Sequence, residues 1–282
     1  MHDLHDPGAK ASELLRDDDT TMPSRVSAAP GPVSGGMAEP HEAVARSAVA
    51  RPRSARPLLA RVARYAILIV AGLLIVVIAH LAVYRFFDPP FTTLTAARWI
   101  AGEAVEQTWV PLNRISPQLL RAVIASEDAR FCQHWGVDPG ALEAAIEDWW
   151  SGTPRGGSTI SMQVVKNLFL WPQRSVVRKA VELPLALVLE LLWPKQRILE
   201  VYLNIAEWGP NVFGAEAAAR YHFDKSASAL GVDEAARLAV SLPNPIARDA
   251  GDPNARLLLL ADLIGSRMRS ANVSCIALPD RR

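Results

Sequence analysis

The longest apolar stretch of the chain predicts a membrane-spanning helix. Residues 66–84 read AILIVAGLLIVVIAHLAVY and carry no charged side chain. A helix needs roughly 20 such residues to cross the hydrocarbon core of a bilayer. A cleaved signal peptide would have a shorter apolar core nearer the N-terminus. We therefore predict one retained transmembrane helix over residues 66–84.

Beyond residue 90, apolar residues recur at helical spacing, whereas alternating strand patterns are scarce. Ser116 and Pro117 fit the N-cap and first position of one helix, and Asp138 and Pro139 those of the next. Further helical patterns follow in STISMQVVKNLFL, SVVRKAVELPLALVLELLW, PKQRILEVYLNIAEWG, FGAEAAARYHF and GVDEAARLAVSL. The predicted fold class is mainly α.

Charge is placed unevenly along the 282 residues, although the formal net charge of +1 indicates no particular partner. Residues 1–50 are rich in Ala, Pro, Gly and Ser and predict a disordered tail. Residues 51–65 form a basic juxtamembrane segment with five arginines. By the positive-inside rule, the tail is expected to be cytoplasmic and residues 90–282 to form one external domain.

The positions of the cysteines and histidines predict neither a particular disulfide nor a metal site. Cys132 and Cys275 lie far apart in sequence, so an oxidising compartment would permit a disulfide without the spacing showing one. We expect Cys132 to be a small buried apolar residue. The six histidines lack metal-ligand spacing, so no protein-ligated metal site is predicted.

Three segments place polar side chains where packing alone would not. In the first, Glu127, Phe131 and His134 continue the apolar stripe of the preceding helix at steps of four and three, with Asp128 beside them. If the helix continued, they would share one face. A carboxylate on an apolar face is costly unless it is paired or used.

The second segment repeats this spacing with Thr159, Gln163 and Lys166. The glycines at 156–157 allow a close backbone approach, and Ser158 is the predicted helix cap. A helix start of this kind favours anions.

The third segment holds Arg178, Lys179 and Glu182 within one turn, with Arg174 a further turn upstream. Taken alone, Arg178 and Glu182 could be an ordinary surface pair. Together, the three segments supply two carboxylates and four cations. A pyrophosphate leaving group needs its negative charge held by Lys and Arg rather than a proton donor. This set therefore predicts glycosyl transfer from a sugar pyrophosphate, with one base and a cationic cradle.

Five ordered motifs resemble the peptidoglycan glycosyltransferase family (family 51), in its monofunctional biosynthetic transglycosylase branch. They are EDARFCQHWG, RGGSTISMQVVKNLFL, RKAVELP, KQRILEVYLN and GPNVFGAEAAARYHFDK. The resemblance covers about residues 95–265. No SxxK, SxN and KTG set follows, so no transpeptidase module is expected.

The resemblance implies a lysozyme-like helical head with a smaller membrane-proximal jaw lobe. It implies polymerisation of lipid II into β-1,4-linked glycan with release of undecaprenyl pyrophosphate, at the periplasmic face of a bacterial inner membrane. Lipid II, the growing glycan strand and the membrane are the implied partners, with other cell-wall synthesis or divisome proteins as candidates and no nucleic acid. No cofactor is required, although Mg²⁺ could bridge Glu182 and the pyrophosphate.

Site residues carry over from the family motifs to matching positions. Glu127 resembles the base that deprotonates the acceptor 4-hydroxyl, and Glu182 the second carboxylate near the donor phosphates. Asp128, Phe131 and His134 match residues that orient the base. The matches to the donor and pyrophosphate site are Ser158, Thr159, Gln163, Lys166, Arg174, Arg178 and Lys179.

Two positions depart from the family pattern. Met162 replaces the first of two glutamines and cannot form the hydrogen bonds of a side-chain amide, and Asp224 stands where glycine is commoner.

Two interpretations stay open for the apolar segment LPLALVLELLW, which fits a core helix and a membrane-contacting surface equally well. Two other functions stay open: a membrane-bound lysozyme-like hydrolase, and a catalytically inactive scaffold that binds lipid-linked precursors.

Overall fold

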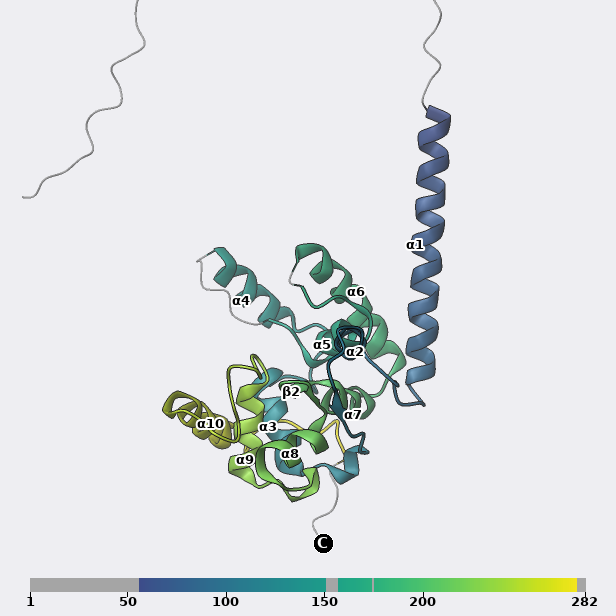
Figure 1. Cartoon of the computed structure of the whole chain (residues 1–282). Helices are drawn as coiled ribbons and strands as arrows, with labels where there is room; N and C mark the ends of the chain where they lie inside the picture. Colours follow the sequence, from purple (N-terminus) through teal and green to yellow (C-terminus); the bar gives the residue numbers. More distant parts are fainter. Residues whose placement is uncertain (1–55, 151–156, 174, 278–282) are drawn as a thin grey trace, which may run out of the picture. The chain divides into compact units, whose positions relative to one another are not determined.

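A computed structural model describes residues 56–150, 157–173 and 175–277 (Figure 1). The described part is mainly helical, which confirms the predicted fold class. The disordered tail predicted for residues 1–50 and the site residue Arg174 lie outside the described residues. The helices are α1 Arg56–Tyr84, α2 Thr93–Ile100, α3 Pro117–Glu127, α4 Pro139–Trp150, α5 Ile160–Phe169, α6 Val176–Leu192, α7 Lys195–Ile205, α8 Ala215–Phe223, α9 Val232–Ser241 and α10 Ala255–Arg267, with short 3-10 turns at Leu112–Arg114 and Ala227–Ala229.

Helix α1 contains the predicted transmembrane segment. Residues Leu58–Tyr84 form a 27-residue apolar span with a mean hydropathy of 3.0 in its most apolar window. The helix begins before the predicted span and includes Arg61 and Arg64, because arginine is a good helix former and its long side chain can reach the interface. Within the described part of the chain, the prediction of one helix long and apolar enough to cross a membrane is confirmed.

The C-terminal end of α1 is bonded to residues around α6 and α7. The indole N–H of Trp193 donates to the carbonyl of Leu81 at 2.6 Å, and the guanidinium of Arg197 donates to the carbonyl of Tyr84 at 2.9 Å. Leu81 is fully buried. The chain therefore leaves the membrane segment directly against the helical domain.

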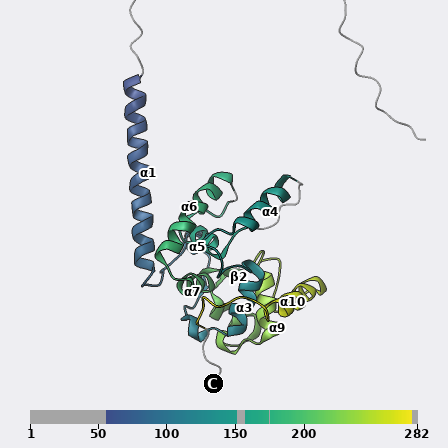
Figure 2. The same ribbon diagram turned by 180° about the vertical axis from the view of Figure 1, so that it is seen from behind.

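The core forms where α3 packs on α9, α9 on α10, and α5 on α6 and α7 (Figures 1 and 2). Phe131, Tyr202 and Trp208 are among its largest fully buried side chains. A small sheet has the order β1 (Glu106–Gln107), β3 (Val212–Phe213), β2 (Glu207–Gly209), with β1 parallel and β2 antiparallel to β3.

Several helix ends agree with the sequence. Ser116 caps α3 by accepting the N–H of Gln118, and Asp138 caps α4 by accepting the N–H of Ala141 at 3.1 Å. Asp224 ends α8 with φ of +50°, a left-handed conformation in which glycine is most at ease and aspartate is tolerated. The turn is thus kept without glycine.

The predicted cap of α5 was wrong by one residue. Thr159, not Ser158, is the N-cap, and its hydroxyl accepts the N–H of Met162 at 3.2 Å. The hydroxyl of Ser158 instead accepts from Lys179 at 2.7 Å. The ammonium group of Lys179 thus binds the hydroxyl of Ser158, which was predicted to cap the helix.

The continuous helical face predicted for Glu127, Phe131 and His134 was also wrong. Helix α3 ends at Glu127, and the following residues form turns. Asp128 leaves the helical region with φ of −158° and ψ of 73°, and its carboxylate bonds to α5 and to His134. Such side-chain bonds compete with continuation of a helix. Phe131 and His134 are nevertheless buried.

Helix α6 places one face of LPLALVLELLW in the core, as the core-helix interpretation predicted, and leaves another face exposed. Leu185 and Leu189 are buried in the core, whereas Leu187 is 51% and Leu191 78% exposed. The helix continues through Pro184. One face packs inward, and the other offers apolar surface outside the core.

Cys132 and Cys275 form a disulfide, so the expectation that Cys132 is simply a small buried apolar residue was wrong. The bond joins the turn after α3 to the C-terminal segment, 143 positions away. Sequence spacing could not show this pairing, because the fold alone brings the two segments together.

Removing the disulfide should destabilise the domain. Closing so long a loop restricts the unfolded chain, and native disulfides typically contribute roughly 2–5 kcal/mol. We expect Cys132→Ser/Cys275→Ser to lower the thermal midpoint of the detergent-solubilised chain by several degrees. Reductant should lower the midpoint of the unmodified chain similarly and leave the double variant unchanged. Equal midpoints in all four samples would show that the bond contributes nothing.

Candidate active site

Glu127 lies at the C-terminal end of α3 and faces α5. The amide of Gln163 donates to Glu127 Oε2 at 2.8 Å, and the hydroxyl of Tyr202 donates to Gln163 Oε1 at 3.2 Å. Tyr202 is 1% exposed. Two hydrogen bonds therefore connect the buried Tyr202 of α7, through Gln163 of α5, to the carboxylate of Glu127 and fix its position.

The surroundings of Glu127 act on its protonation. Burial raises the pKa of the Glu127 carboxyl, and the neighbouring charge of Asp128 adds to the rise. The bond from Gln163 and the charges of Lys166 and Arg248 oppose it, without cancelling the effect of burial. A carboxylate with a raised pKa is better suited to accept a proton from a hydroxyl.

Asp128 holds the turn beside Glu127 in place. Its carboxylate accepts the N–H of Ile160 at 3.0 Å and lies 2.9 Å from His134 Nε2. Thr159 Oγ1 donates to the carbonyl of Gly136 at 2.5 Å. All these polar groups are buried or partly buried, so the turn after α3 is joined to the start of α5 at several points. Asp128 and His134 thus position Glu127 rather than contact it.

Phe131 is contacted by a partly buried lysine, Lys195, that was not predicted as a site residue. Lys195 Nζ lies 4.4 Å from the centre of the Phe131 ring and donates to the carbonyl of His134 at 2.8 Å. It also donates to Glu190 at 2.6 Å, and Glu190 accepts from Ser161. Lys195 lies in the KQRILEVYLN motif, so the motif marked the segment without indicating this side chain.

Glu182 lies in a cationic setting on α6. Its Oε1 accepts from Arg178 and its Oε2 from Lys179 at 3.0 Å. Glu182 is 2% and Arg178 8% exposed, so the surface-pair reading of these residues was wrong. Lys179 Nζ also donates to Ser158 Oγ, which joins the start of α5 to α6.

Lys166 on α5 connects the two carboxylates electrostatically. Burial and the charge of Arg178 lower the pKa of the Lys166 ammonium, whereas Glu182 and Glu127 raise it. Among the described residues, Lys166 Nζ has no hydrogen-bond partner, in contrast to Lys179. Its charge is therefore available to a negatively charged group between Glu127 and Glu182.

A pocket of about 280 Å³ opens beside Glu127. Its lining includes Glu127 and Asp128 from the end of α3, together with Gly157, Ser158 and Thr159 from the start of α5. The first and second predicted segments thus meet around one cavity. The third joins them through the bond between Lys179 and Ser158.

Met162, the departure from the family pattern, is fully buried. Its side chain therefore fills the core, and the side-chain amide of Gln163 alone donates a hydrogen bond to Glu127. Two further residues near Glu127 were missed by sequence reasoning. Tyr202 lies in the KQRILEVYLN motif, which did not indicate its bond to Gln163, and Arg248 lies in a loop without a recognisable motif.

Glu182, as it lies here, does not fit a Mg²⁺ ligand. Both of its carboxylate oxygens already accept from cationic side chains, so a divalent ion would have to displace at least one of them. Within residues 56–150, 157–173 and 175–277, no three His, Cys, Asp or Glu side chains gather as a metal site.

Residues 94–269 match the family model described as Transglycosylase. This mainly helical domain with its two carboxylates and cationic cluster therefore belongs to the transglycosylase family. A relative from Rhodospirillum centenum is 47% identical over 225 residues, which cover 78% of this chain and 97% of the relative. One from Agrobacterium fabrum is 44% identical over 218 residues, covering 76% of this chain and 96% of the relative. Both are named biosynthetic peptidoglycan transglycosylase.

Proposed function

We propose that Glu127 is the catalytic base of this enzyme and that Lys166, Arg178 and Lys179 hold the leaving pyrophosphate near Glu182. The chain is a peptidoglycan glycosyltransferase that polymerises glycan strands from lipid II in cell-wall synthesis. The match covers the transglycosylase domain.

The proposed reaction has one proton transfer and one displacement. Glu127 accepts the proton of the acceptor 4-hydroxyl as the hydroxyl oxygen bonds to the anomeric carbon of the donor. The bond from that carbon to the pyrophosphate oxygen breaks, and its electron pair stays on the phosphate. Lys166 and the cations beside Glu182 stabilise this charge as it develops. The products are a glycan longer by one disaccharide and undecaprenyl pyrophosphate.

The observation that carries this proposal is the contrast between the two carboxylates. Glu127 lies in a setting that raises its pKa, whereas Glu182 is paired with Arg178 and Lys179. Carboxylates in such different surroundings take different roles. Lys166 lies within electrostatic range of both, where the scissile bond would have to be placed.

Incubating the purified full chain with labelled lipid II tests the proposal. We expect long glycan products together with released undecaprenyl pyrophosphate. A hydrolase would instead shorten preformed glycan, and a scaffold would bind lipid II without forming product. Either of these results would overturn the proposed roles.

We further propose that the N-terminus is cytoplasmic and the catalytic domain periplasmic. Five arginines precede the apolar run of α1, whereas Arg85 alone follows it closely. A reporter that is active only in the periplasm should be active when it is fused after residue 282. A reporter that is active only in the cytoplasm should be active when it is fused before residue 51. The reverse pattern would contradict the orientation.

A further inference from the structure

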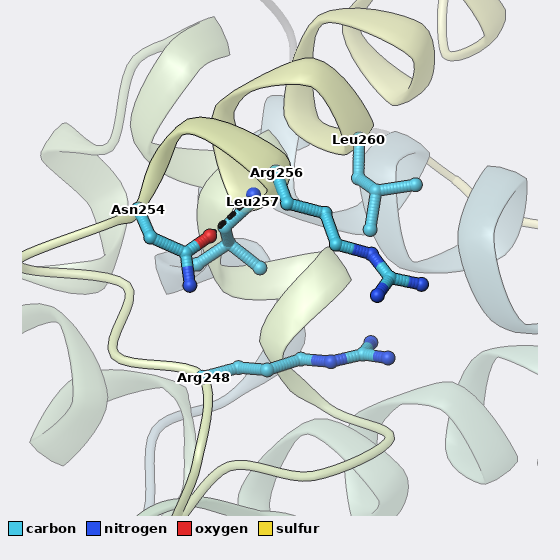
Figure 3. A pocket seen from close by; sticks show the side chains of 5 residues that line it. All are labelled: Arg248, Asn254, Arg256, Leu257 and Leu260. Atoms are coloured by element: carbon cyan, nitrogen blue, oxygen red, sulfur yellow. Dashed lines mark hydrogen bonds between the residues drawn. The ribbon is translucent and has the colours of Figure 1, made fainter.

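A second pocket, of about 220 Å³, lies between the loop that precedes α10 and the first turns of that helix. Figure 3 shows its lining: Arg248 from the loop, and Asn254, Arg256, Leu257 and Leu260 at the start of α10. The side chains of Arg248 and Arg256 extend in the same direction, and their guanidinium groups end one above the other. The pocket thus combines two cations with two leucines.

The loop holds Arg248 in a defined position. Its guanidinium donates to the carbonyl of Val240 at 2.8 Å, and its backbone N–H donates to Asn244. The neighbouring Asp249 accepts the N–H of Gly251 at 2.8 Å. Arg248 is therefore oriented before any ligand binds, which reduces the entropy lost on binding.

Among the described residues, neither guanidinium lies within ion-pair distance of a carboxylate. The guanidinium of Arg248 donates to the neutral carbonyl of Val240. In the part of the chain that the structure describes, Arg256 has no ion-pair partner. Two close like charges repel each other, so an anion between them would be stabilised by both. Guanidinium groups suit flat oxyanions in particular, because they can donate two parallel bonds.

The pocket lies on the Glu127 side of the site rather than the Glu182 side. The charge of Arg248 acts on Glu127, whereas the charges that act on Lys166 are those of Arg178, Glu182, Glu127 and Lys179. Helix α10 packs on α3 and α9, away from α5 and α6 (Figure 1). The two-arginine pocket is therefore separate from the group proposed to hold the leaving pyrophosphate.

We propose that Arg248 and Arg256 bind a carboxylate of the peptide carried by the acceptor substrate. This inference rests on the proposed function, because the acceptor 4-hydroxyl must approach Glu127. Peptidoglycan precursors offer two kinds of anion: pyrophosphate and peptide carboxylates. The pyrophosphate of the donor belongs with Lys166 and Glu182. The pyrophosphate of the acceptor is joined directly to a lipid and so stays at the membrane, where α1 contacts α6, whereas α10 packs on α9 and α3. The peptide carboxylates are therefore the anions that can reach the pocket at α10. Leu257 and Leu260 would contact the aliphatic part of the peptide.

The test compares two acceptors at a saturating concentration of a preformed lipid-linked glycan donor. One acceptor is lipid II with free peptide carboxylates, and the other is lipid II in which those carboxylates are converted to amides. Arg256→Gln is the informative variant, because Arg256 is exposed and makes no side-chain bond within the described residues. Arg267→Gln, an exposed arginine at the other end of α10, is the matched control.

We expect Arg256→Gln to raise the acceptor KM roughly ten-fold for free carboxylates, the scale of one lost charge-assisted bond, with kcat nearly unchanged. For the amidated acceptor, the variant and the unmodified chain should have the same KM. The Arg267→Gln control should match the unmodified chain with both acceptors.

An equal rise in KM for both acceptors would indicate that the pocket binds the acceptor pyrophosphate, and would overturn the proposal. An unchanged KM for both would show that the pocket does not contact the acceptor. In either case the unmodified chain still makes glycan, so the proposed function would stand. Failure of the unmodified chain to make glycan would instead refute the function itself.

Discussion

Replacing Glu127 with glutamine should abolish glycan polymerisation while leaving lipid II binding intact. The amide keeps the shape of the carboxylate but cannot accept the proton of the acceptor hydroxyl. General-base catalysis typically contributes 10²–10⁴-fold, so product should fall to near background. The measurement is glycan formation from labelled lipid II, with binding followed separately on the same preparation.

The neighbouring carboxylate provides a contrast for this variant. Asp128 bonds to Ile160 and His134 and holds the turn, so Asp128→Asn should lower both activity and thermal stability. Glu127→Gln should leave the thermal midpoint nearly unchanged, since the side-chain oxygen of the new glutamine can still accept the hydrogen bond from Gln163. Near-normal turnover by Glu127→Gln would exclude this residue as the base.

The pH dependence of activity follows from the same residue. A base must be ionised to work, and the pKa of Glu127 is raised above its usual value by burial. The acid limb of kcat/KM should therefore lie at higher pH than an ordinary glutamate would give. Gln163→Leu removes a bond that stabilises the ionised form, so it should move this limb further upward.

Local sequence patterns predicted the helices, whereas the geometry of the site depends on contacts between segments. Caps and apolar periodicity predicted α3 and α4 because those signals are local. The helical spacing of Glu127, Phe131 and His134 gave a false geometry, since α3 stops at Glu127. The residues still gather, but through the bonds of Asp128 to α5 and of Lys195 to the carbonyl of His134.

The features that sequence could not predict depend on contacts between distant segments. The disulfide between Cys132 and Cys275 and the bond from Tyr202 to Gln163 require the packed domain. Helices α2 and α10 were not predicted, and the sheet has strands of two or three residues, which are too short for an alternating pattern. The charge of Arg248 acts on Glu127 only because α9 packs on α3.

Among the cations, Lys166 offers the cleanest test of the pyrophosphate site. Arg178 forms a buried ion pair with Glu182, so removing it would take away one of the two cations that pair with this buried carboxylate, Lys179 being the other, and would destabilise the fold. A loss of activity in Arg178→Ala would then have two causes. Lys166 makes no such pair in the described part of the chain, and burial and Arg178 already disfavour its charged form.

Lys166→Met should therefore lower kcat by roughly 10²–10³, the usual scale for one donor that stabilises charge in a transition state. Methionine keeps an unbranched apolar stem of similar length, so the packing of α5 should be retained and the thermal midpoint should not fall. Removing a buried cation beside Arg178 also relieves repulsion, which favours an equal or higher midpoint. Lys225→Met is the control, because Lys225 pairs with Glu234 at an exposed position. Unchanged turnover in Lys166→Met would place the developing phosphate charge elsewhere, because Lys166 is the described cation that acts on Glu127 and is itself acted on by Glu182.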